Sequence, residues 1–148
     1  RVPLIIGTCM VEPMARQAPF ALPVRIYWED TDAGGVVFYA NYLKFFERAR
    51  TEWLRCLGIE QQRLRDETGA MFVVSSTSLR YHRPARLDDC LQVTARLAQL
   101  GRATMTFEQQ ALRDSELLVD GEIRIGCVDG QSFQPRRIPF ALLDRLST

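Results

Sequence analysis

Three carboxylates lie within four residues of this chain, and two glycines follow them closely. The acids are Glu29, Asp30 and Asp32, and the glycines are Gly34 and Gly35. One interpretation is a solvated turn, because Asp and Gly are turn residues and acids are common near helix starts. The other is a reaction centre, in which a carboxylate works beside the unpaired N–H groups of a helix start. The rest of the chain must decide between these two.

The cysteines and the single histidine argue against metal chemistry. His82 is the only histidine, and this excludes a centre built from several histidines. The cysteines are widely scattered, with no CxxC or Cys/His spacing, which argues against a zinc site. Because no dense cysteine pattern indicates disulfides, we expect a reducing compartment and a cytoplasmic protein. We expect no metal and no other cofactor. The cysteines are Cys9, Cys56, Cys90 and Cys127.

Length and charge limit the classes of function further. At 148 residues the chain fits one domain with a substantial core. The net charge of +1 gives no electrostatic footprint for a nucleic-acid partner. No apolar run approaches the ~20 residues that span a bilayer, so we expect no transmembrane segment. We expect residues 1–20 to be a tail outside the fold, and residues 21–148 to form a single domain.

A strand and a long helix flank the acidic segment. Residues 24–28 are rich in β-formers and predict a strand. From about Asn41, apolar residues recur at three- and four-residue steps, which predicts a helix with one buried face. Gly58 is well placed to end this helix. Its apolar residues are Tyr42, Phe45, Phe46, Ala49, Trp53, Cys56 and Leu57.

The second half of the chain predicts a sheet with short connections. A polar helical turn at 61–67, closed by Gly69, precedes the strands, and a short helix begins near Pro139. Gly101-Arg102 and Asp114-Ser115 are turn signals between strands. The order indicates an α+β fold, in which about five mostly antiparallel strands wrap a long helix. The further strands are predicted over residues 71–81, 90–97, 104–112 and 117–128.

Three blocks of sequence carry a resemblance to a known family. The blocks are DTDAGGVV at 30–37 followed by NY at 41–42, FERAR at 46–50, and YHRPARLDD at 81–89. They resemble hotdog-fold acyl-CoA thioesterases, in the branch with 4-hydroxybenzoyl-CoA thioesterase and the Tol–Pal-associated thioesterases. A lone Asp-x-Asp is a weak signal, but the blocks together are a specific one. The resemblance implies a hotdog fold, a link to the Tol–Pal system, and hydrolysis of acyl-CoA to free acid and CoA.

The resemblance assigns two catalytic groups. The catalytic carboxylate of the family falls on Asp32, and the N–H that polarises the thioester carbonyl falls on Tyr39. Many Tol–Pal-type relatives have His at that position, whereas the hydroxybenzoyl-CoA enzyme has Tyr. Either residue can supply the main-chain N–H. Asp32 would act as a nucleophile, through a mixed anhydride, or as a base that activates water. Without the resemblance, Asp32 would be interpreted as a helix-capping residue.

Substrate contacts are assigned to a glycine and two arginines. Gly35, with its neighbour Gly34, allows a substrate to approach the backbone closely. CoA carries phosphates, so basic residues at the pocket mouth are expected. Arg102 lies in the hairpin where relatives hold the nucleotide end, and Arg83 follows a predicted strand. Each arginine is otherwise an ordinary solvated side chain.

Other conspicuous side chains are interpreted as structural. In another hotdog branch a glutamate of the long helix is catalytic; here Glu47 could assist, but pairing with Arg48 or Arg50 on the surface is favoured. His82 is expected to pack or hydrogen-bond near the sheet edge, with no acid–base partner evident from spacing. The helix aromatics Tyr42, Phe45, Phe46 and Trp53 are interpreted as core, and some could also line an acyl tunnel.

The resemblance also implies an oligomer and leaves two other functions open. Family members pair their sheets edge to edge and build the active site between two subunits, so we expect a dimer, assembled into a homotetramer. One alternative function is a non-catalytic scaffold of phospholipid synthesis that binds acyl groups or acyl carrier protein. The other is a dehydratase, against which the position of His82, outside the acidic segment, argues. The acyl group that is preferred is left open, as is the choice between CoA and acyl carrier protein.

Overall fold

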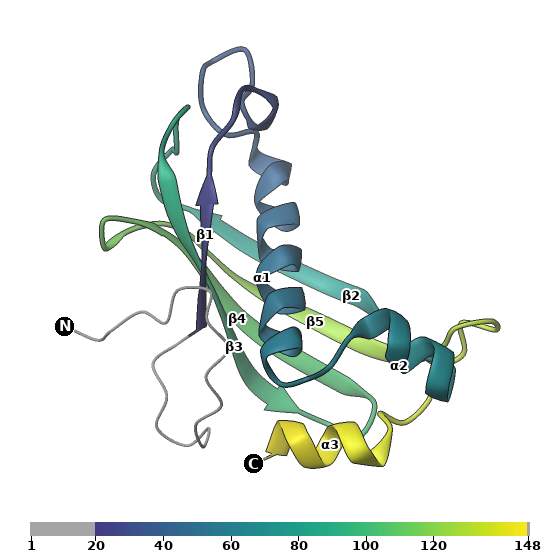
Figure 1. The fold of residues 1–148 in the computed structure, drawn as a ribbon. Helices are drawn as coiled ribbons and strands as arrows, with labels where there is room; N and C mark the ends of the chain where they lie inside the picture. Colours follow the sequence, from purple (N-terminus) through teal and green to yellow (C-terminus); the bar gives the residue numbers. More distant parts are fainter. Residues whose placement is uncertain (1–19, 148) are drawn as a thin grey trace.

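The computed structural model describes residues 20–147, in which a long helix lies against one curved sheet (Figure 1). The predicted tail, residues 1–20, lies outside the described residues except for Phe20, which begins the first strand. The elements in chain order are β1 (Phe20–Arg25), η2 (Trp28–Asp30), η3 (Tyr39–Asn41), α1 (Tyr42–Cys56), α2 (Gln61–Thr68), β2 (Ala70–Tyr81), β3 (Cys90–Leu100), β4 (Thr104–Arg113), β5 (Glu116–Asp129) and α3 (Phe140–Ser147).

The five strands form an antiparallel sheet in the order β1-β3-β4-β5-β2. The sheet curves around α1, which covers one of its faces (Figure 1). The predicted α+β hotdog arrangement is therefore confirmed. The strands β1 and β2 form the two edges of the sheet.

The core lies between α1 and the covered face of the sheet. Phe45 and Phe46 of α1 have no exposed surface, as the three- and four-residue steps predict. Across from them, Phe107 of β4 is fully buried and stands opposite Ile123 of β5 in the strand register. Burial of one such side chain contributes about 1.5–3 kcal/mol, so these aromatics hold the helix on the sheet.

A polar pair is buried inside this apolar core. Arg50 of α1 is 7% exposed and donates from Nη1 to Oε1 of Gln109 at 2.9 Å. Gln109 of β4 is 1% exposed, and its Nε2 donates to the carbonyl oxygens of Phe46 and Thr94, each at 3.0 Å. Burial lowers the pKa of Arg50 and the charge of Glu47 opposes this, but the guanidinium stays charged at neutral pH. This pair fastens α1 to two strands.

The first strand lies earlier in the chain than predicted. Residues 24–28 were expected to be extended, but β1 ends at Arg25 and a 3₁₀ turn begins at Trp28. A carboxylate oxygen of Asp30 accepts the N–H of Tyr27 at 2.8 Å and so curls the chain back. The strand also includes Pro23, which its edge position tolerates.

Both helix ends in the first half follow the glycine prediction. Gly58 after α1 and Gly69 after α2 have φ values of +79° and +77°, in the left-handed region that glycine favours. Arginines from the end of the chain add to both. Arg145 donates to the carbonyl oxygen of Gly58 at 3.2 Å, and Arg136 donates to that of Thr68 at 2.9 Å. Cations there complement the negative helix end. Between residues 20 and 147, no helix is long and apolar enough to cross a membrane.

Candidate active site

Asp30, the first aspartate of the motif, is a structural residue. It is 8% exposed, and its Oδ1 accepts the side-chain N–H of Asn41 at 2.8 Å. Its carbonyl oxygen accepts the N–H of Phe38 at 2.9 Å. Together with the bond from Tyr27, these contacts tie the acidic segment to the start of α1. Asp30 therefore positions the loop that lies between it and the helix.

Asp32, the predicted catalytic residue, is exposed on that loop. Its Oδ1 accepts the N–H of Gly34 at 2.8 Å, and its carbonyl oxygen accepts the N–H of Gly35 at 3.0 Å. Gly35 has a φ of +78°, which explains the glycine at this turn. Asp32 does not cap a helix: the N-cap of η3 is Phe38, that of α1 is Asn41, and neither has a side-chain cap. The capping interpretation of Asp32 is therefore wrong.

Tyr39 begins the helical segment, as the donor role requires. It is the first residue of η3, which continues directly into α1. The N–H of Asn41 bonds to the carbonyl oxygen of Phe38 at 2.8 Å. Because the N–H of Tyr39 comes before this turn is closed, no carbonyl of the helix accepts it. A bridge between Thr31 and Val37 closes the loop that contains Asp32, and Tyr39 follows two residues after this bridge.

The downstream block folds directly against this loop. The carbonyl oxygen of Ala85 accepts the N–H of Val37 at 2.9 Å, and Val36 forms a bridge with Arg86. Ala85 is fully buried. The first and the third of the three blocks that carry the resemblance are therefore one structural unit. Arg83, a predicted substrate contact, pairs through Nε with Glu116 at 3.1 Å.

Arg113 holds this block in place from β4. Its Nη1 donates to Oδ2 of Asp89 at 2.7 Å and to the carbonyl oxygen of Pro84 at 3.2 Å. Partial burial disfavours the charge of Asp89. The N–H of Arg86 and the Arg113 guanidinium outweigh this and hold the pKa of Asp89 below its ordinary 3.8. Asp89 is thus a charged anchor of the loop.

Asp89→Asn is expected to lower the free energy of unfolding at pH 7 by about 1.5 kcal/mol, because a charge-assisted hydrogen bond is lost. The folded pKa is depressed, so the stabilisation is present above the unfolded value of 3.8 and is lost as pH falls through the folded one. Urea unfolding at pH 7 and at about pH 3 measures this difference. An equal difference between variant and wild type at both pH values would contradict the assignment.

Arg102 lies far from Asp32 within one chain. It belongs to the connection between β3 and β4, and this connection lies at the end of α1 opposite to the connection between β1 and α1 (Figure 1). Its carbonyl oxygen accepts the N–H of Ile138 at 2.8 Å, which brings the exposed Arg137 alongside. Arg137 could not be predicted from sequence spacing, since only the fold places it beside the hairpin. Within one chain, therefore, the Asp32 carboxylate and these two arginines do not lie together.

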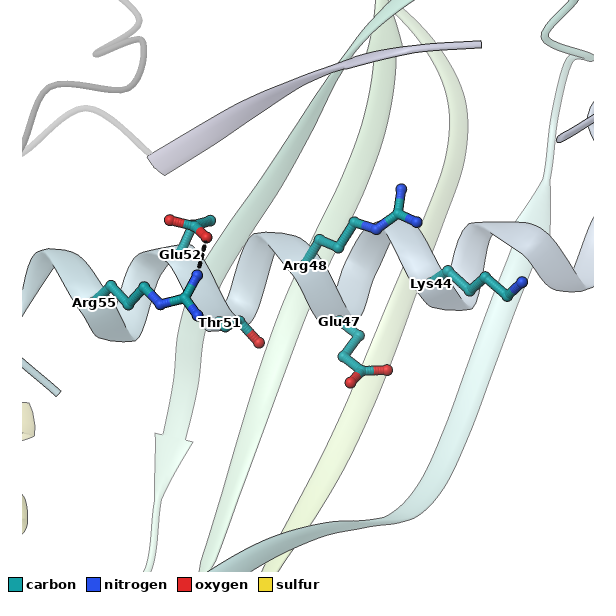
Figure 2. Close-up of a pocket in the computed structure, with 6 residues that line it drawn as sticks. All are labelled: Lys44, Glu47, Arg48, Thr51, Glu52 and Arg55. Carbon is teal, nitrogen blue, oxygen red and sulfur yellow. Dashed lines mark hydrogen bonds and ion pairs between the residues drawn. The ribbon is translucent and has the colours of Figure 1, made fainter. Parts of the chain in front are cut away.

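Glu47 lies on the outward face of α1. It lines a cavity of about 320 Å³ along that face (Figure 2). Glu47 and Arg48 point to different sides of the helix, and Glu47 forms no ion pair in the described part of the chain. The expected surface pairing with Arg48 or Arg50 is therefore absent there, although the charge of Glu47 does act on Arg50. The cavity is lined by Lys44, Glu47, Arg48, Thr51, Glu52 and Arg55.

His82 has an acid partner that sequence spacing did not reveal. Its Nε2 lies 3.0 Å from Oδ1 of Asp120, on the neighbouring strand β5. The expected hydrogen bond near the sheet edge is present. Both side chains are substantially exposed.

A second cavity, of about 360 Å³, lies between the end of β1 and Asp88; like the first, it is lined by neither Asp32 nor Tyr39.

The edge strand β2 leaves apolar surface uncovered. Val74, the fifth residue of β2, is 52% exposed in the single chain. At its other end Tyr81 is 49% exposed, and its ring meets the exposed ring of Tyr39, which in turn meets that of Phe38. An edge strand with exposed apolar side chains suits pairing with another chain.

Comparison with known proteins agrees with this architecture. The family model described as "Thioesterase superfamily" matches residues 34–119, from the glycines of the acidic loop into β5. This chain belongs to the thioesterase superfamily. The match includes the helix start and the whole downstream block, so the family predicted from these blocks is confirmed.

Relatives of this superfamily member cover most of the chain. An acyl-CoA thioesterase YbgC of Haemophilus influenzae is 45% identical, over 81% of this chain and 88% of its own length. An acyl-CoA thioester hydrolase YbgC of Escherichia coli O6:H1 is 42% identical, over 84% and 92%. Among solved structures, a probable thioesterase from Bartonella henselae is 35% identical with a TM-score of 0.77, over 82% of this chain and all of that one.

Proposed function

We propose that this protein hydrolyses acyl-CoA thioesters to free acid and CoA, with the Asp32 carboxylate and the Tyr39 N–H as its reacting groups. The observation that carries the proposal is their order along the chain: a closed loop with an exposed carboxylate leads, two residues after its closing bridge, into a helix start. The names of the relatives support the same reaction. A free-thiol assay across aromatic, short-chain and long-chain acyl-CoAs tests it, and no turnover with any of them would contradict it.

We assign different roles at the thioester to the Tyr39 N–H and to the Asp32 carboxylate. Attack on the carbonyl carbon places negative charge on its oxygen, and the Tyr39 N–H at the positive end of the helix would stabilise that charge. One such donor contributes roughly 3 kcal/mol in the transition state. Asp32 supplies the attack. As a nucleophile it forms a mixed anhydride and releases the CoA thiolate, and water then cleaves the anhydride; as a base it takes a proton from attacking water.

A dimer is the smallest unit that suits this proposal, with a homotetramer as the assembled form. The separation of Asp32 and Arg102 in one chain supports it, because a second subunit could bring its own Arg102 to the first subunit's loop. The exposed edge of β2 offers the surface for pairing. Light scattering on the purified protein gives the assembly mass, and a monomeric active enzyme would contradict this arrangement.

Arg102 and the adjacent Arg137 would hold the phosphates of CoA. Two exposed guanidinium groups on neighbouring segments suit a phosphate cluster. Arg83 is a weaker candidate, since its guanidinium is paired with Glu116. Gly35 would let the thioester approach the loop.

Arg102→Gln is expected to raise KM for acyl-CoA roughly tenfold, with little change in kcat, because a charge-assisted contact to phosphate is lost. KM for the matching acyl-pantetheine, which lacks the nucleotide, should stay at the wild-type value. Arg96→Gln is the control, since Arg96 is an exposed arginine of β3 paired with Glu108. An equal rise in KM for both substrates would contradict a nucleotide contact.

Acyl carrier protein is a second possible acyl donor, because its phosphopantetheine arm matches that of CoA. The cations on the outward face of α1, Lys44, Arg48 and Arg55, favour an acidic partner, although Glu47 and Glu52 lie among them (Figure 2). A scaffold without catalysis would bind acyl carrier protein and release no thiol.

We place the thioester hydrolysis in the cytoplasm, and we include a link with the Tol–Pal system in the proposal.

A further inference from the structure

The helix start at Tyr39 depends on contacts from outside the helix. Neither Phe38 nor Asn41, the two N-cap residues, carries a side-chain cap, and the amide of Asn41 is used on Asp30. The phenol O–H of Tyr81, the last residue of β2, donates to the carbonyl oxygen of Tyr39 at 2.9 Å. A hydroxyl of the sheet edge thus holds the main chain of the residue that is assigned the oxyanion contact.

We propose that Tyr81 is a positioning residue for thioester hydrolysis, whose hydroxyl fixes the orientation of the Tyr39 N–H. This inference depends on the proposed role of that N–H. It goes beyond the catalytic pair, because Tyr81 acts only through the main chain of Tyr39 and needs no contact with the substrate.

The main-chain groups on both sides of the Tyr39 N–H are held. Before it, the N–H of Phe38 bonds to Asp30 at 2.9 Å, and the carbonyl oxygen of Phe38 accepts the N–H of Asn41 at 2.8 Å. After it, the Tyr39 carbonyl is held by Tyr81. Fixing the groups on either side limits rotation of the peptide that carries the N–H. Tyr81 supplies the one of these bonds that comes from a separate strand.

Ring packing sets the direction of the Tyr81 hydroxyl. The ring of Tyr81 meets the ring of Tyr39 at a centroid distance of 6.4 Å and an interplanar angle of 78°. It also meets the ring of Tyr42 at 5.9 Å and 62°. Such edge-to-face contacts are favourable arrangements of aromatic pairs. They hold the phenol on the helix start even though the side chain is about half exposed.

A positioning role predicts an effect on kcat rather than on KM. The negative charge on the carbonyl oxygen develops only after the substrate has bound. A misdirected N–H therefore stabilises the transition state less and leaves the affinity for the substrate unchanged. A displacement of 1 Å in a catalytic group can cost on the order of 10²-fold in rate. Tyr81→Phe retains the ring and its packing but removes the hydroxyl, so we expect kcat to fall about tenfold, with KM unchanged within about twofold.

Tyr42→Phe is the matched control. Tyr42 belongs to the same aromatic cluster, but its hydroxyl contacts the main chain of Ala85 and not that of Tyr39. It is 2% exposed, so removal of its hydroxyl should lower the melting temperature more than Tyr81→Phe does. A purely structural role of the cluster would make the two variants lose activity in step with their stability. A positioning role makes kcat fall in Tyr81→Phe alone.

Three outcomes are distinguishable with Asp32→Asn measured in parallel. Loss of activity in Asp32→Asn together with a fall in kcat for Tyr81→Phe supports the inference. Loss of activity in Asp32→Asn with wild-type kcat in Tyr81→Phe leaves the proposed function standing and overturns the inference. Wild-type activity in Asp32→Asn overturns the proposed site, and the role of Tyr81 falls with it.

Discussion

Asp32→Asn is expected to lower kcat for acyl-CoA hydrolysis roughly 10³-fold, within the range for removal of a general base, and more if Asp32 is the nucleophile. An amide neither attacks the carbonyl nor takes a proton from water at neutral pH. The substitution keeps an oxygen that can accept the Gly34 N–H, so the turn should persist. KM should stay close to the wild-type value, because the lost interaction is one of the transition state. A continuous free-thiol assay with one good acyl-CoA substrate measures both constants.

Two matched substitutions separate Asp32 from the other acids. Glu29→Gln removes an exposed carboxylate from the same segment and should leave kcat unchanged. Glu47→Gln removes the carboxylate of the outward face of α1, the position that another hotdog branch uses for catalysis. If Glu47→Gln were inactive and Asp32→Asn were active, the carboxylate on the helix would be the catalytic one and the proposed site would be wrong.

Gln109→Leu is expected to lower the free energy of unfolding by about 3 kcal/mol, because it leaves the buried guanidinium of Arg50 without its acceptor. It also removes two hydrogen bonds from the amide of Gln109 to main-chain carbonyls. Gln110→Leu, at the adjacent exposed position, should change stability by less than about 0.5 kcal/mol. Urea unfolding monitored by tryptophan fluorescence gives both values.

The double variant Arg50→Met, Gln109→Leu tests whether the two residues act as a pair. With the buried charge also gone, the loss of stability should fall short of the sum of the single losses by about 1.5 kcal/mol or more. Strict additivity of the two single effects would show that the Arg50–Gln109 contact contributes little. The apolar contacts around Phe45 and Phe46 would then hold α1 on the sheet without this polar link.

Local periodicity was enough to predict the main elements of the fold. The apolar steps of α1, the alternation in β3 and β4 and the glycines that end the helices are properties of short segments, and the structure has these elements within a few residues of the predicted bounds. The start of β1 was missed for a tertiary reason. Its edge position tolerates Pro23, and the hydrogen bond from the Tyr27 N–H to the Asp30 carboxylate turns the chain out of the strand after Arg25.

Contacts between residues that are far apart in the sequence lie outside the reach of such patterns. Tyr81 and Tyr39 are 42 positions apart, His82 and Asp120 are 38 apart, and Arg50 and Gln109 are 59 apart. Only the folded sheet brings these partners together. Asp32 and Tyr39, which are close in the chain, could therefore be predicted from sequence, but Tyr81, which contacts Tyr39 from a distant strand, could not.

The most direct test of the catalytic account is a crystal structure of Asp32→Asn with the acyl-CoA that wild type hydrolyses best. The slow variant should retain the intact thioester. The account predicts the carbonyl oxygen at hydrogen-bond distance, about 2.7–3.1 Å, from the main-chain nitrogen of Tyr39. The side chain of residue 32 should face the carbonyl carbon. A thioester bound with its carbonyl away from both residues, for example against Glu47 on α1, would contradict it.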